Sequence, residues 1–317
     1  MRASPYSLTM IGLPAIGSLA DLAAETHLSQ GFLYRLWKGA DGYYRIFEVP
    51  KAGGGLRAIS APNRKLKAVQ AWILRNILDK ATVAGCATAF RRGWGIKHNV
   101  EPHTRNRFFL CMDMEGFFPS IRYGKVWTIF NTLGYSQHVA HILTCLCTCE
   151  GALPQGGVTS PALSNLVCTR LDRRLAGLAG ARGVLYTRYA DDLTFSAMTP
   201  SKLAWMTRYV TGILRDEGFE VNHRKTRFMG PRRCRRVTGL VVRDEGFGIA
   251  HDTKRLLRAK LHRLFAAGLP GLERARLAAH LRGWAAFLRD VDPAAKSQLE
   301  RYERRLRDRF GGVGCFG

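Results

Sequence analysis

The sequence predicts an α+β fold that carries a separate helical lobe on its C-terminal side. Short apolar segments, some alternating and some continuous, are typical of strands, and they lie between longer segments of helical periodicity. The strand-like segments lie near residues 43–59, 107–113, 184–197 and 237–242. From Thr253 to Phe310 the pattern is helical, and breaks at Pro270 and Pro293 favour three helices.

The charge balance predicts a nucleic-acid partner. The 317 residues include 49 Lys and Arg against 24 Asp and Glu, a formal net charge of +25, and such an excess favours nucleic acid over a membrane surface. The sequence has no run of about 18 apolar residues, so we expect no transmembrane helix. Residues 1–20 lack a signal-peptide pattern. The eight cysteines lack paired zinc spacing, so we expect a reduced, cytoplasmic protein without disulfides.

The first hundred residues predict helices followed by a basic hairpin. Residues 1–40 favour short helices. The alternation from Tyr43 to Ile59, interrupted by the glycines at 53–55, predicts a β-hairpin, and residues 66–78 predict an amphipathic helix. Residues 49–100 hold ten Lys and Arg and a single acid, which favours a phosphate-binding surface over scattered solvated charges.

An apolar run from Arg107 to Met112 ends in Asp113. A buried strand that delivers a carboxylate at its end suits a metal site, and a capping Asp is the ordinary alternative. Farther along, residues 136–149 favour a helix. The glycines of Leu153–Gly157 then predict a loop whose backbone can approach a ligand closely, and a Ser-Pro pair opens a helix after it.

Asp191 and Asp192 are adjacent within a β-prone apolar stretch. A regular strand would point them to opposite faces and bury one unpaired, at a cost of several kcal/mol. We therefore expect two strands, roughly 184–190 and 193–197, joined by a sharp turn that carries both carboxylates. An exposed acidic turn is the ordinary alternative. The Asp113 strand outweighs it, because two-metal nucleotidyl transfer needs carboxylates from separate segments.

The C-terminal third continues the basic character. A helix is expected over residues 201–217, and seven Lys and Arg follow within residues 224–236 without an acid. The apolar run Val237–Val242 predicts a single buried strand. The helical lobe from Thr253 to Phe310 carries a net charge of +9, which again favours a polyanion.

The ordered motifs resemble those of reverse transcriptases. They are the strand ending in Asp113 with Phe117-Phe118-Pro119-Ser120-Ile121, then Pro154-Gln155-Gly156, and Tyr189-Ala190-Asp191-Asp192. Asn99-Val100-Glu101-Pro102-His103 and Val237-Thr238-Gly239 further resemble two elements of the bacterial retron enzymes, and Val100 departs from the Ala of that family. The resemblance covers residues 43 to 310 and is specific as an ordered set rather than motif by motif.

The resemblance implies an RNA-directed DNA polymerase with the right-hand fold of fingers, antiparallel-sheet palm and helical thumb. The N-terminal helices and fingers would occupy residues 1–105, the palm with interleaved fingers elements 106–250, and the basic thumb 251–317. By the same resemblance, Asp113, Asp191 and Asp192 would be catalytic and would bind two Mg²⁺ ions.

The resemblance also implies a nucleotide site. The dNTP-binding side chains would be Lys51, Arg57, Phe118, Gln155 and Lys225. Phe118 would exclude a ribose 2′-OH, so that dNTPs are favoured. Lys225 is a candidate for protonating the leaving group, and a contact to backbone phosphate is the alternative.

Retron enzymes copy part of their own structured non-coding RNA (msr-msd) into single-stranded DNA, and the resemblance implies the same here. They prime from an RNA 2′-OH, which yields branched RNA–DNA (msDNA), and they act with an effector protein in anti-phage defence. The RNA-binding residues would be Asn99, His103, Arg232, Arg233, Arg235, Arg236, Val237, Thr238 and Gly239. A packed loop histidine is the alternative for His103.

Two other functions are open at this point. One is a group II intron-like or diversity-generating reverse transcriptase; intron enzymes usually carry extensions, which we do not expect after the thumb. The other is a non-catalytic RNA-binding scaffold with a polymerase fold. The presence of Asp113, Asp191, Asp192 and Gln155 favours an active enzyme.

Overall fold

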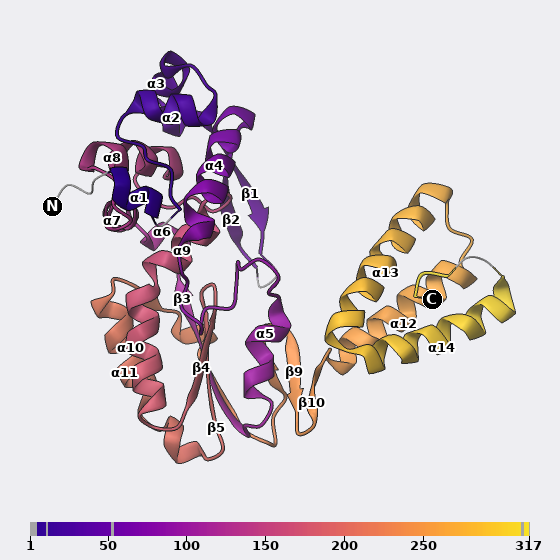
Figure 1. Ribbon diagram of the computed structural model, residues 1–317. Coiled ribbons are helices and arrows are strands. Elements are labelled where there is room, and N and C mark those ends of the chain that lie inside the picture. Colours follow the sequence, from indigo (N-terminus) through magenta and orange to yellow (C-terminus); the bar gives the residue numbers. More distant parts are fainter. Residues whose placement is uncertain (1–4, 11, 52–53, 312–313, 317) are drawn as a thin grey trace.

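The computed structural model describes residues 5–10, 12–51, 54–311 and 314–316. Three short helices lead the chain into the fold (Figure 1). They are α1 (Pro5–Met10), α2 (Leu19–Thr26) and α3 (Gln30–Lys38). Ser18 and Ser29 start the last two helices, because their side chains accept hydrogen bonds from the backbone N–H groups of Asp21 and Phe32.

A β-hairpin and two helices follow in the part of the chain that is expected to form the fingers. These elements are β1 (Tyr44–Pro50), β2 (Leu56–Pro62), α4 (Arg64–Asn76) and α5 (Ile96–Val100). The hairpin is antiparallel, with Tyr44 opposite Pro62 and Pro50 opposite Leu56, as the alternation predicts. Gly53 of the expected glycine loop lies outside the described residues.

An antiparallel sheet forms the palm. Its strands are β3 (Phe108–Glu115), β4 (Leu185–Tyr189), β5 (Asp192–Ala197), β6 (Glu220–Val221) and β7 (Arg227–Met229). The order is β4-β5-β3-β6, and β7 also pairs with β3. The central strand β3 is therefore buried on both sides along most of its length, which explains its continuous apolar sequence.

Helices cover this sheet and link its strands. They are α6 (Phe117–Ser120), α7 (Tyr123–Thr132), α8 (Gln137–Cys147), α9 (Ser160–Val167), α10 (Thr169–Gly180) and α11 (Met206–Asp216). In Figure 1, α10 and α11 lie on one side of the palm sheet and α5 lies on the other. Short 3₁₀ turns connect several elements at residues 40–43, 78–80, 101–103, 200–203 and 223–225.

A second, smaller sheet corrects one prediction from the sequence. The expected single strand over Val237–Val242 is instead a hairpin, because Val237 pairs with Leu240. Thr238 and Gly239 turn the chain with φ of 44° and 88°, a conformation in which glycine is favoured. The strands are β8 (Arg235–Val237), β9 (Leu240–Arg243) and β10 (Gly246–Gly248).

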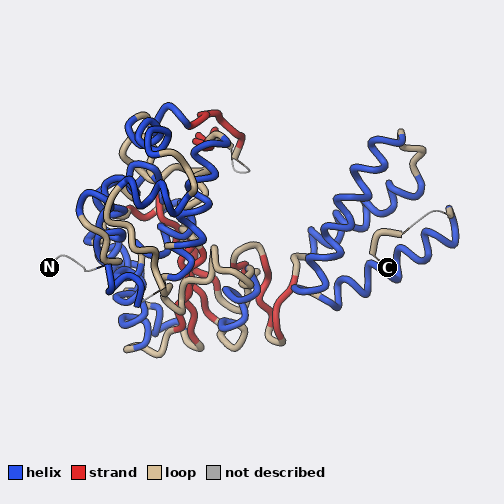
Figure 2. The backbone as a smooth tube through the Cα atoms, turned by 45° about the horizontal axis from the view of Figure 1, so that its top comes forward, coloured by secondary structure: helices blue, strands red, loops and turns tan. Residues whose placement is uncertain are grey.

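The three expected C-terminal helices form the thumb. They are α12 (His251–Ala266), α13 (Gly271–Val291) and α14 (Pro293–Phe310). Figures 1 and 2 both show this lobe set apart from the rest of the chain and joined to it through the small sheet. In the described residues, no helix is both long and apolar enough to cross a membrane.

The apolar core has two parts. The larger cluster joins the N-terminal helices to the palm, and the smaller one joins the small sheet to the thumb. Phe109 and Cys111 of β3 belong to the smaller cluster, whereas Leu110 and Met112 belong to the larger. Because successive side chains of a strand point to opposite faces, β3 connects both cores, and Asp113 near its end has little freedom to move.

Candidate active site

The two adjacent aspartates lie at the tip of the β4–β5 hairpin. Tyr189 and Asp192 are register partners, so Ala190 and Asp191 form the connection. Ala190 has a φ of 57°, in the left-handed region, and its carbonyl oxygen accepts a hydrogen bond from Arg188 Nη1 at 3.2 Å. The sharp turn predicted from the sequence is therefore present, and both carboxylates are half-buried at its tip.

Asp113 reaches the same place through strand pairing. It is the register partner of Asp192 across β3 and β5, a position that puts the two Cα atoms about 4.5–5.5 Å apart. The backbone N–H of Met114 donates to the carbonyl oxygen of Asp191 at 3.0 Å. The structure thus brings together the three carboxylates that the sequence singled out, and their catalytic role stays a prediction.

Burial and mutual repulsion perturb these acids. Burial, followed by the charges of Asp191 and Asp113, raises the pKa of Asp192 to about 6. Burial is also the main cause that raises the pKa of Asp191, and the charge of Asp113 adds to it. A cluster of carboxylates that resists ionisation is stabilised by a cation among them.

Lys225 supplies one such cation. Its ammonium group donates to both carboxylate oxygens of Asp113, at 3.0 and 2.9 Å. This hydrogen bonding raises the pKa of Lys225. The lysine side chain is 59% exposed, whereas that of Asp113 is 8% exposed, so the pair lies at the mouth of the site with its cation facing solvent.

The acidic residues can be judged against what Mg²⁺ requires. Within the described ranges, no three His, Cys, Asp or Glu side chains are arranged as a ready metal cage. Both oxygens of Asp113 are engaged by Lys225. Carboxylate oxygens are nevertheless the ligands that this hard cation prefers, and burial together with neighbouring carboxylates raises the pKa of Asp191 and Asp192, which a bound cation would offset. The residues therefore fit Mg²⁺ once Lys225 releases Asp113.

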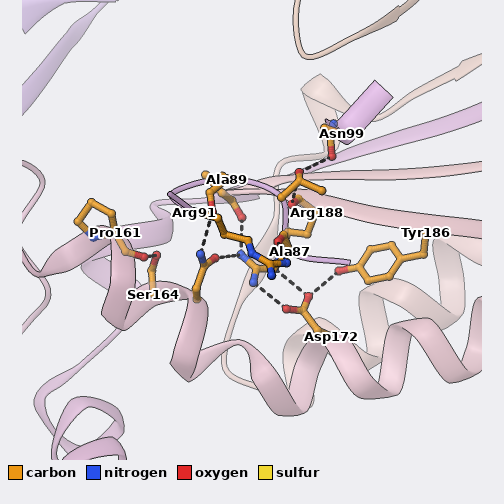
Figure 3. Close-up of polar contacts among 12 residues, drawn as sticks. Ala87, Ala89, Arg91, Asn99, Pro161, Ser164, Asp172, Tyr186 and Arg188 are labelled. Carbon is orange, nitrogen blue, oxygen red and sulfur yellow. Dashed lines mark hydrogen bonds and ion pairs between the residues drawn. The ribbon is translucent and has the colours of Figure 1, made fainter. Parts of the chain in front are cut away.

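A fully buried arginine, which sequence reasoning missed, fixes the turn. Arg188 donates to both oxygens of Asp172, at 2.8 and 2.7 Å, and both side chains are 0% exposed. Figure 3 shows the two side chains facing each other, with Tyr186 pointing at the same carboxylate. A charged residue in an apolar strand was the available signal, since a buried charge requires a partner; the sequence did not say that Asp172 is that partner.

The same arginine organises the segments around it. Its Nη1 donates to Asn165 at 3.1 Å as well as to Ala190. Its backbone N–H donates to Cys86, and its carbonyl oxygen accepts from Thr88. Arg188 therefore ties the β4–β5 hairpin to helix α9 and to the loop that precedes α5.

The predicted triphosphate-binding cations lie on the fingers hairpin and are exposed. Lys51 lies at the end of β1, where its backbone N–H bonds to Gly55. Arg57 lies on β2, and its positive charge acts on the acidic site. This charge lowers the pKa of Asp191, which opposes the effect of burial. These positions agree with a triphosphate role, which stays a prediction.

The loop that carries Gln155 is held against the same hairpin. The carbonyl oxygen of Gln155 accepts from the backbone N–H of Ser60 at 2.9 Å. Gly156 approaches so closely that an added Cβ would lie 3.0 Å from the Ser60 carbonyl oxygen. The buried amide of Gln70, which sequence reasoning did not single out, accepts from Val158 N–H and donates to the Leu146 carbonyl oxygen. The loop therefore has a fixed backbone.

Two of the predicted RNA-binding residues have internal partners. Asn99 and His103 are both 0% exposed. His103 bonds to Ser196 and Thr187, and burial lowers its pKa to about 4. Asn99 accepts from Thr88 and donates to Thr238 at 3.4 Å. His103 is therefore a packed histidine, as the alternative interpretation expected. Asn99 and His103 can contribute to RNA binding only by holding the neighbouring segments in place.

The remaining predicted RNA-binding residues lie on or beside the small sheet. Arg235 is buried and donates to the Asn106 carbonyl oxygen and to Asp244, and Val237 is buried as well. Arg232, Arg233 and Arg236 are exposed. The basic segment is therefore divided between structural and solvent-facing side chains.

Two small cavities adjoin the carboxylates. One, of about 250 Å³, is lined by Asp113, Asp192, Arg224, Lys225 and Arg227 together with Cys111 and Met112. The other, of about 170 Å³, lies between Asp192 and the Thr238–Gly239 turn. Arg227, which sequence reasoning did not single out, lines both, and Arg236 lines the second. Carboxylates on one wall and guanidinium groups on another suit a nucleotide whose phosphate faces the arginines.

Comparison with known proteins agrees with this geometry. Residues 49–242 match the family model described as "Reverse transcriptase (RNA-dependent DNA polymerase)". The chain is 39% identical to the Retron Ec86 reverse transcriptase of Escherichia coli, over 96% of this chain and 94% of that protein. It is 38% identical to the Retron Mx65 reverse transcriptase of Myxococcus xanthus, over 95% and 74% of the two chains.

A solved structure supports the fold. The telomerase of Candida albicans superposes with a TM-score of 0.51 at 12% identity. The match covers 86% of this chain, which spans 61% of the telomerase chain. At that identity the likeness concerns the fold alone, and the fold is that of a right-hand polymerase with fingers, antiparallel-sheet palm and helical thumb.

Proposed function

Because this chain belongs to the reverse transcriptase family, and within it to the bacterial retron enzymes, it is an RNA-directed DNA polymerase, and we propose that it copies part of its own structured non-coding RNA into msDNA. In this proposal the enzyme primes from a 2′-OH of that RNA and works in the cytoplasm. An effector protein joins it in anti-phage defence. The identity to two retron enzymes over most of their length supports this function.

One observation carries the catalytic part of the proposal. Asp113 lies opposite Asp192 in the register of β3 and β5, next to Asp191 at the hairpin tip. Two carboxylates from one turn and one from a neighbouring strand form the acidic set that two-metal nucleotidyl transfer needs. We assign the binding of Mg²⁺ to these three residues.

When bound, Mg²⁺ would lower the pKa of the attacking hydroxyl and neutralise the triphosphate and the leaving pyrophosphate. The protein's part is to hold the carboxylates in place and to free the oxygens of Asp113. Lys225 bonds to those oxygens, and with Mg²⁺ bound it would turn toward the triphosphate. There it would contact phosphate or protonate the leaving group.

The nucleotide site extends from the carboxylates to the fingers. Arg57 and Lys51 would hold the triphosphate from the hairpin, and the charge of Arg57 already acts on Asp191. Phe118 packs on Phe117 and Phe90, which supports its role as a wall against a ribose 2′-OH. Gln155 would line the pocket from a loop whose backbone is bonded to β2.

The primer and the RNA would lie on the other side of the carboxylates. The cavity between Asp192 and the Thr238–Gly239 turn has Arg227 and Arg236 in its wall, and two guanidinium groups suit a backbone phosphate. Asn99 donates to Thr238 and so supports that turn from behind. Arg232 and Arg233 are exposed and would add to the basic surface that meets the RNA.

The proposal is tested on protein purified with its nucleic acid. We expect the unsubstituted protein to carry DNA covalently linked to RNA, which survives protease and shortens with ribonuclease. Asp191→Asn should lower Mg²⁺-dependent dNTP incorporation by at least about a hundredfold. Asp79→Asn, which removes an exposed acid outside the site, is the matched control and should be fully active.

Two results would contradict the proposal. Full DNA synthesis by Asp191→Asn would refute the assignment of the carboxylates. Co-purified RNA without linked DNA, together with DNA synthesis on any supplied primer and template, would refute the retron function and leave a general reverse transcriptase.

A further inference from the structure

The loop before α5 exposes aromatic rings that the fold does not use. It carries Phe90-Arg91-Arg92-Gly93-Trp94, and Phe90 and Trp94 are 44% and 40% exposed. Aromatic side chains usually gain most of their stabilising effect from burial. Two of them beside two arginines are therefore an unusual feature for a surface loop, and they form the segment that we call the aromatic loop (residues 90–94).

The second ring of the aromatic loop lies in a stack. The Arg91 guanidinium carbon is 4.0 Å from the centre of the Trp94 ring. The His98 ring is stacked on Trp94 at 5.0 Å with an interplanar angle of 24°. These three flat groups, which we call the Arg91–Trp94–His98 column, are of the kind on which nucleic-acid bases stack.

Phe90 is held in a strained backbone conformation. Its φ is 61°, in the left-handed region that bulky residues rarely adopt. This conformation keeps the ring 6.3 Å from that of Phe118, at 45° to it. Strain that places an exposed ring beside a proposed nucleotide pocket is the pattern expected of a functional residue.

The residues that lead into the aromatic loop are hydrogen-bonded to Arg188, the buried arginine that fixes the Asp191–Asp192 turn, and to its partner Asn165. Thr88 N–H donates to the Arg188 carbonyl oxygen at 2.8 Å, and Asn165 donates to the Ala89 carbonyl oxygen at 2.8 Å. Arg91 itself reaches back to Ala87 at 3.3 Å. Figure 3 shows Ala87, Ala89 and Arg91 around the Arg188–Asp172 pair. The exposed rings therefore keep a fixed position relative to the carboxylates.

The surroundings of the loop favour an anionic ligand. Asp79 is the one acid among residues 49–100, against ten Lys and Arg. Arg92 is exposed within the loop itself. Aromatic rings alone would suit an apolar partner, and arginines alone would suit any polyanion. Rings and arginines side by side suit a chain of bases and phosphates.

We propose that the aromatic loop is a stacking platform for unpaired bases of single-stranded RNA next to the nucleotide pocket. Phe90 receives the base nearest Phe118, and the Arg91–Trp94–His98 column supports the bases that follow. Stacking depends little on base identity, as copying a varied RNA requires. A duplex cannot use the platform, because its bases are already stacked on each other. This inference rests on the proposed function.

The experiment measures binding without catalysis. In an Asp191→Asn background and without divalent metal, the affinity is compared for two RNA duplexes, one blunt and one with a single-stranded 5′ overhang. We expect Phe90→Leu with Trp94→Leu to weaken overhang binding by about five- to a hundredfold and to leave blunt-duplex binding within about twofold. A 2-aminopurine in the first unpaired position should be quenched by the parent protein and recover its fluorescence with the double variant.

The chain offers a matched control. Trp205 is 70% exposed and also has a left-handed φ, of 67°, but it lies at the start of α11, away from the aromatic loop. Trp205→Leu should change neither affinity. Equal losses for both duplexes, or an overhang affinity no lower than that of Trp205→Leu, would overturn the platform.

Failure of the platform can be told apart from failure of the proposed function. If protein with its native Asp191 makes msDNA while the double variant still prefers the overhang, the platform is wrong and the proposed function stands. If the overhang preference is lost as expected while no msDNA forms, the platform stands as an RNA-binding site of another reverse transcriptase.

Discussion

Two ion pairs flank the turn that carries Asp191 and Asp192, and their surroundings differ sharply. Arg188 and Asp172 are both 0% exposed and share two hydrogen bonds. Lys225, by contrast, has a side chain that is 59% exposed on Asp113. Separating a buried pair leaves uncompensated charges, whereas an exposed ammonium returns to water at small cost. We call the Arg188–Asp172 pair the fixed side of the site, because it shapes the turn. We call the Lys225–Asp113 pair the exchangeable side, because another cation can replace Lys225 there.

This division suits a polymerase that repeats one reaction many times. The positions of Asp191 and Asp192 are set by the Arg188 bond to Ala190 and by the pairing with β3. The group opposite them has to move as nucleotide and metal enter and leave.

Breaking the fixed side should have the largest effect. Arg188→Met leaves Asp172 buried without its partner, so we expect the free energy of unfolding to fall by about 3–5 kcal/mol. Polymerase activity should fall as well, because the Ala190 carbonyl loses its donor. Urea denaturation and primer extension at a temperature where the variant is folded measure the two effects.

A double substitution separates stability from positioning. Arg188→Met with Asp172→Leu removes both charges, and apolar replacement of a buried pair is often close to neutral. We expect most of the lost stability to return while activity stays low. A folded double variant with full activity would show that the bond from Arg188 to Ala190 does not position the turn.

On the fixed side, His103 makes the free energy of unfolding depend on pH. Its buried ring bonds to Thr187 of β4 and Ser196 of β5. Burial lowers its pKa from an ordinary 6.5 to about 4 in the folded protein, so between these values the unfolded chain binds a proton that the folded chain does not. The stabilisation is complete above about pH 6.5 and is lost as the pH falls toward 4. It amounts to roughly 3 kcal/mol.

His103→Gln isolates this effect, since the other groups titrate in both proteins. The free energy of unfolding of the parent should fall more steeply than that of the variant between pH 6.5 and 4.5, and urea titrations at several pH values measure both. Parallel curves would mean that His103 titrates as it does in an unfolded chain.

Breaking the exchangeable side should barely affect stability. Lys225→Met removes an exposed partner, so the free energy of unfolding should change by less than about 1 kcal/mol. Mn²⁺ binding, followed by electron paramagnetic resonance, should tighten by up to about fivefold because a competing cation has left Asp113. Weaker Mn²⁺ binding would show that Lys225 helps to build the metal site. A lower rate despite tighter binding would support a part in proton transfer or phosphate binding.

Local patterns predicted the hairpin tip correctly. Asp191 beside Asp192 in a β-prone stretch cannot remain a regular strand without burying a lone charge, and the turn at Ala190 is the observed solution. Over Val237–Val242 the same kind of reasoning was wrong. The apolar run hid a turn at Thr238–Gly239, because the glycine after a β-branched residue gave a weak turn signal within a continuous apolar stretch.

Burial of polar residues could not be predicted from the sequence. Asp172 lies in a helix rich in arginine, where an acid ordinarily faces solvent, and yet it is fully buried. Asn99 and His103 were assigned to RNA binding by resemblance, and their side chains bond to Thr88, Thr238, Ser196 and Thr187 inside the protein. Each case depends on a partner far away in the chain.

The sequence by itself determined the elements whose cause is local. These are the β1–β2 and β4–β5 hairpins, the amphipathic helices, the basic character and the three carboxylates, since each follows from neighbouring residues and from side-chain periodicity. The tertiary structure alone decided which charges are buried and with whom, as for Arg188 with Asp172 and Lys225 with Asp113. The physical reason is that the cost of burying a charge depends on what surrounds it in space, and no pattern along the chain records that.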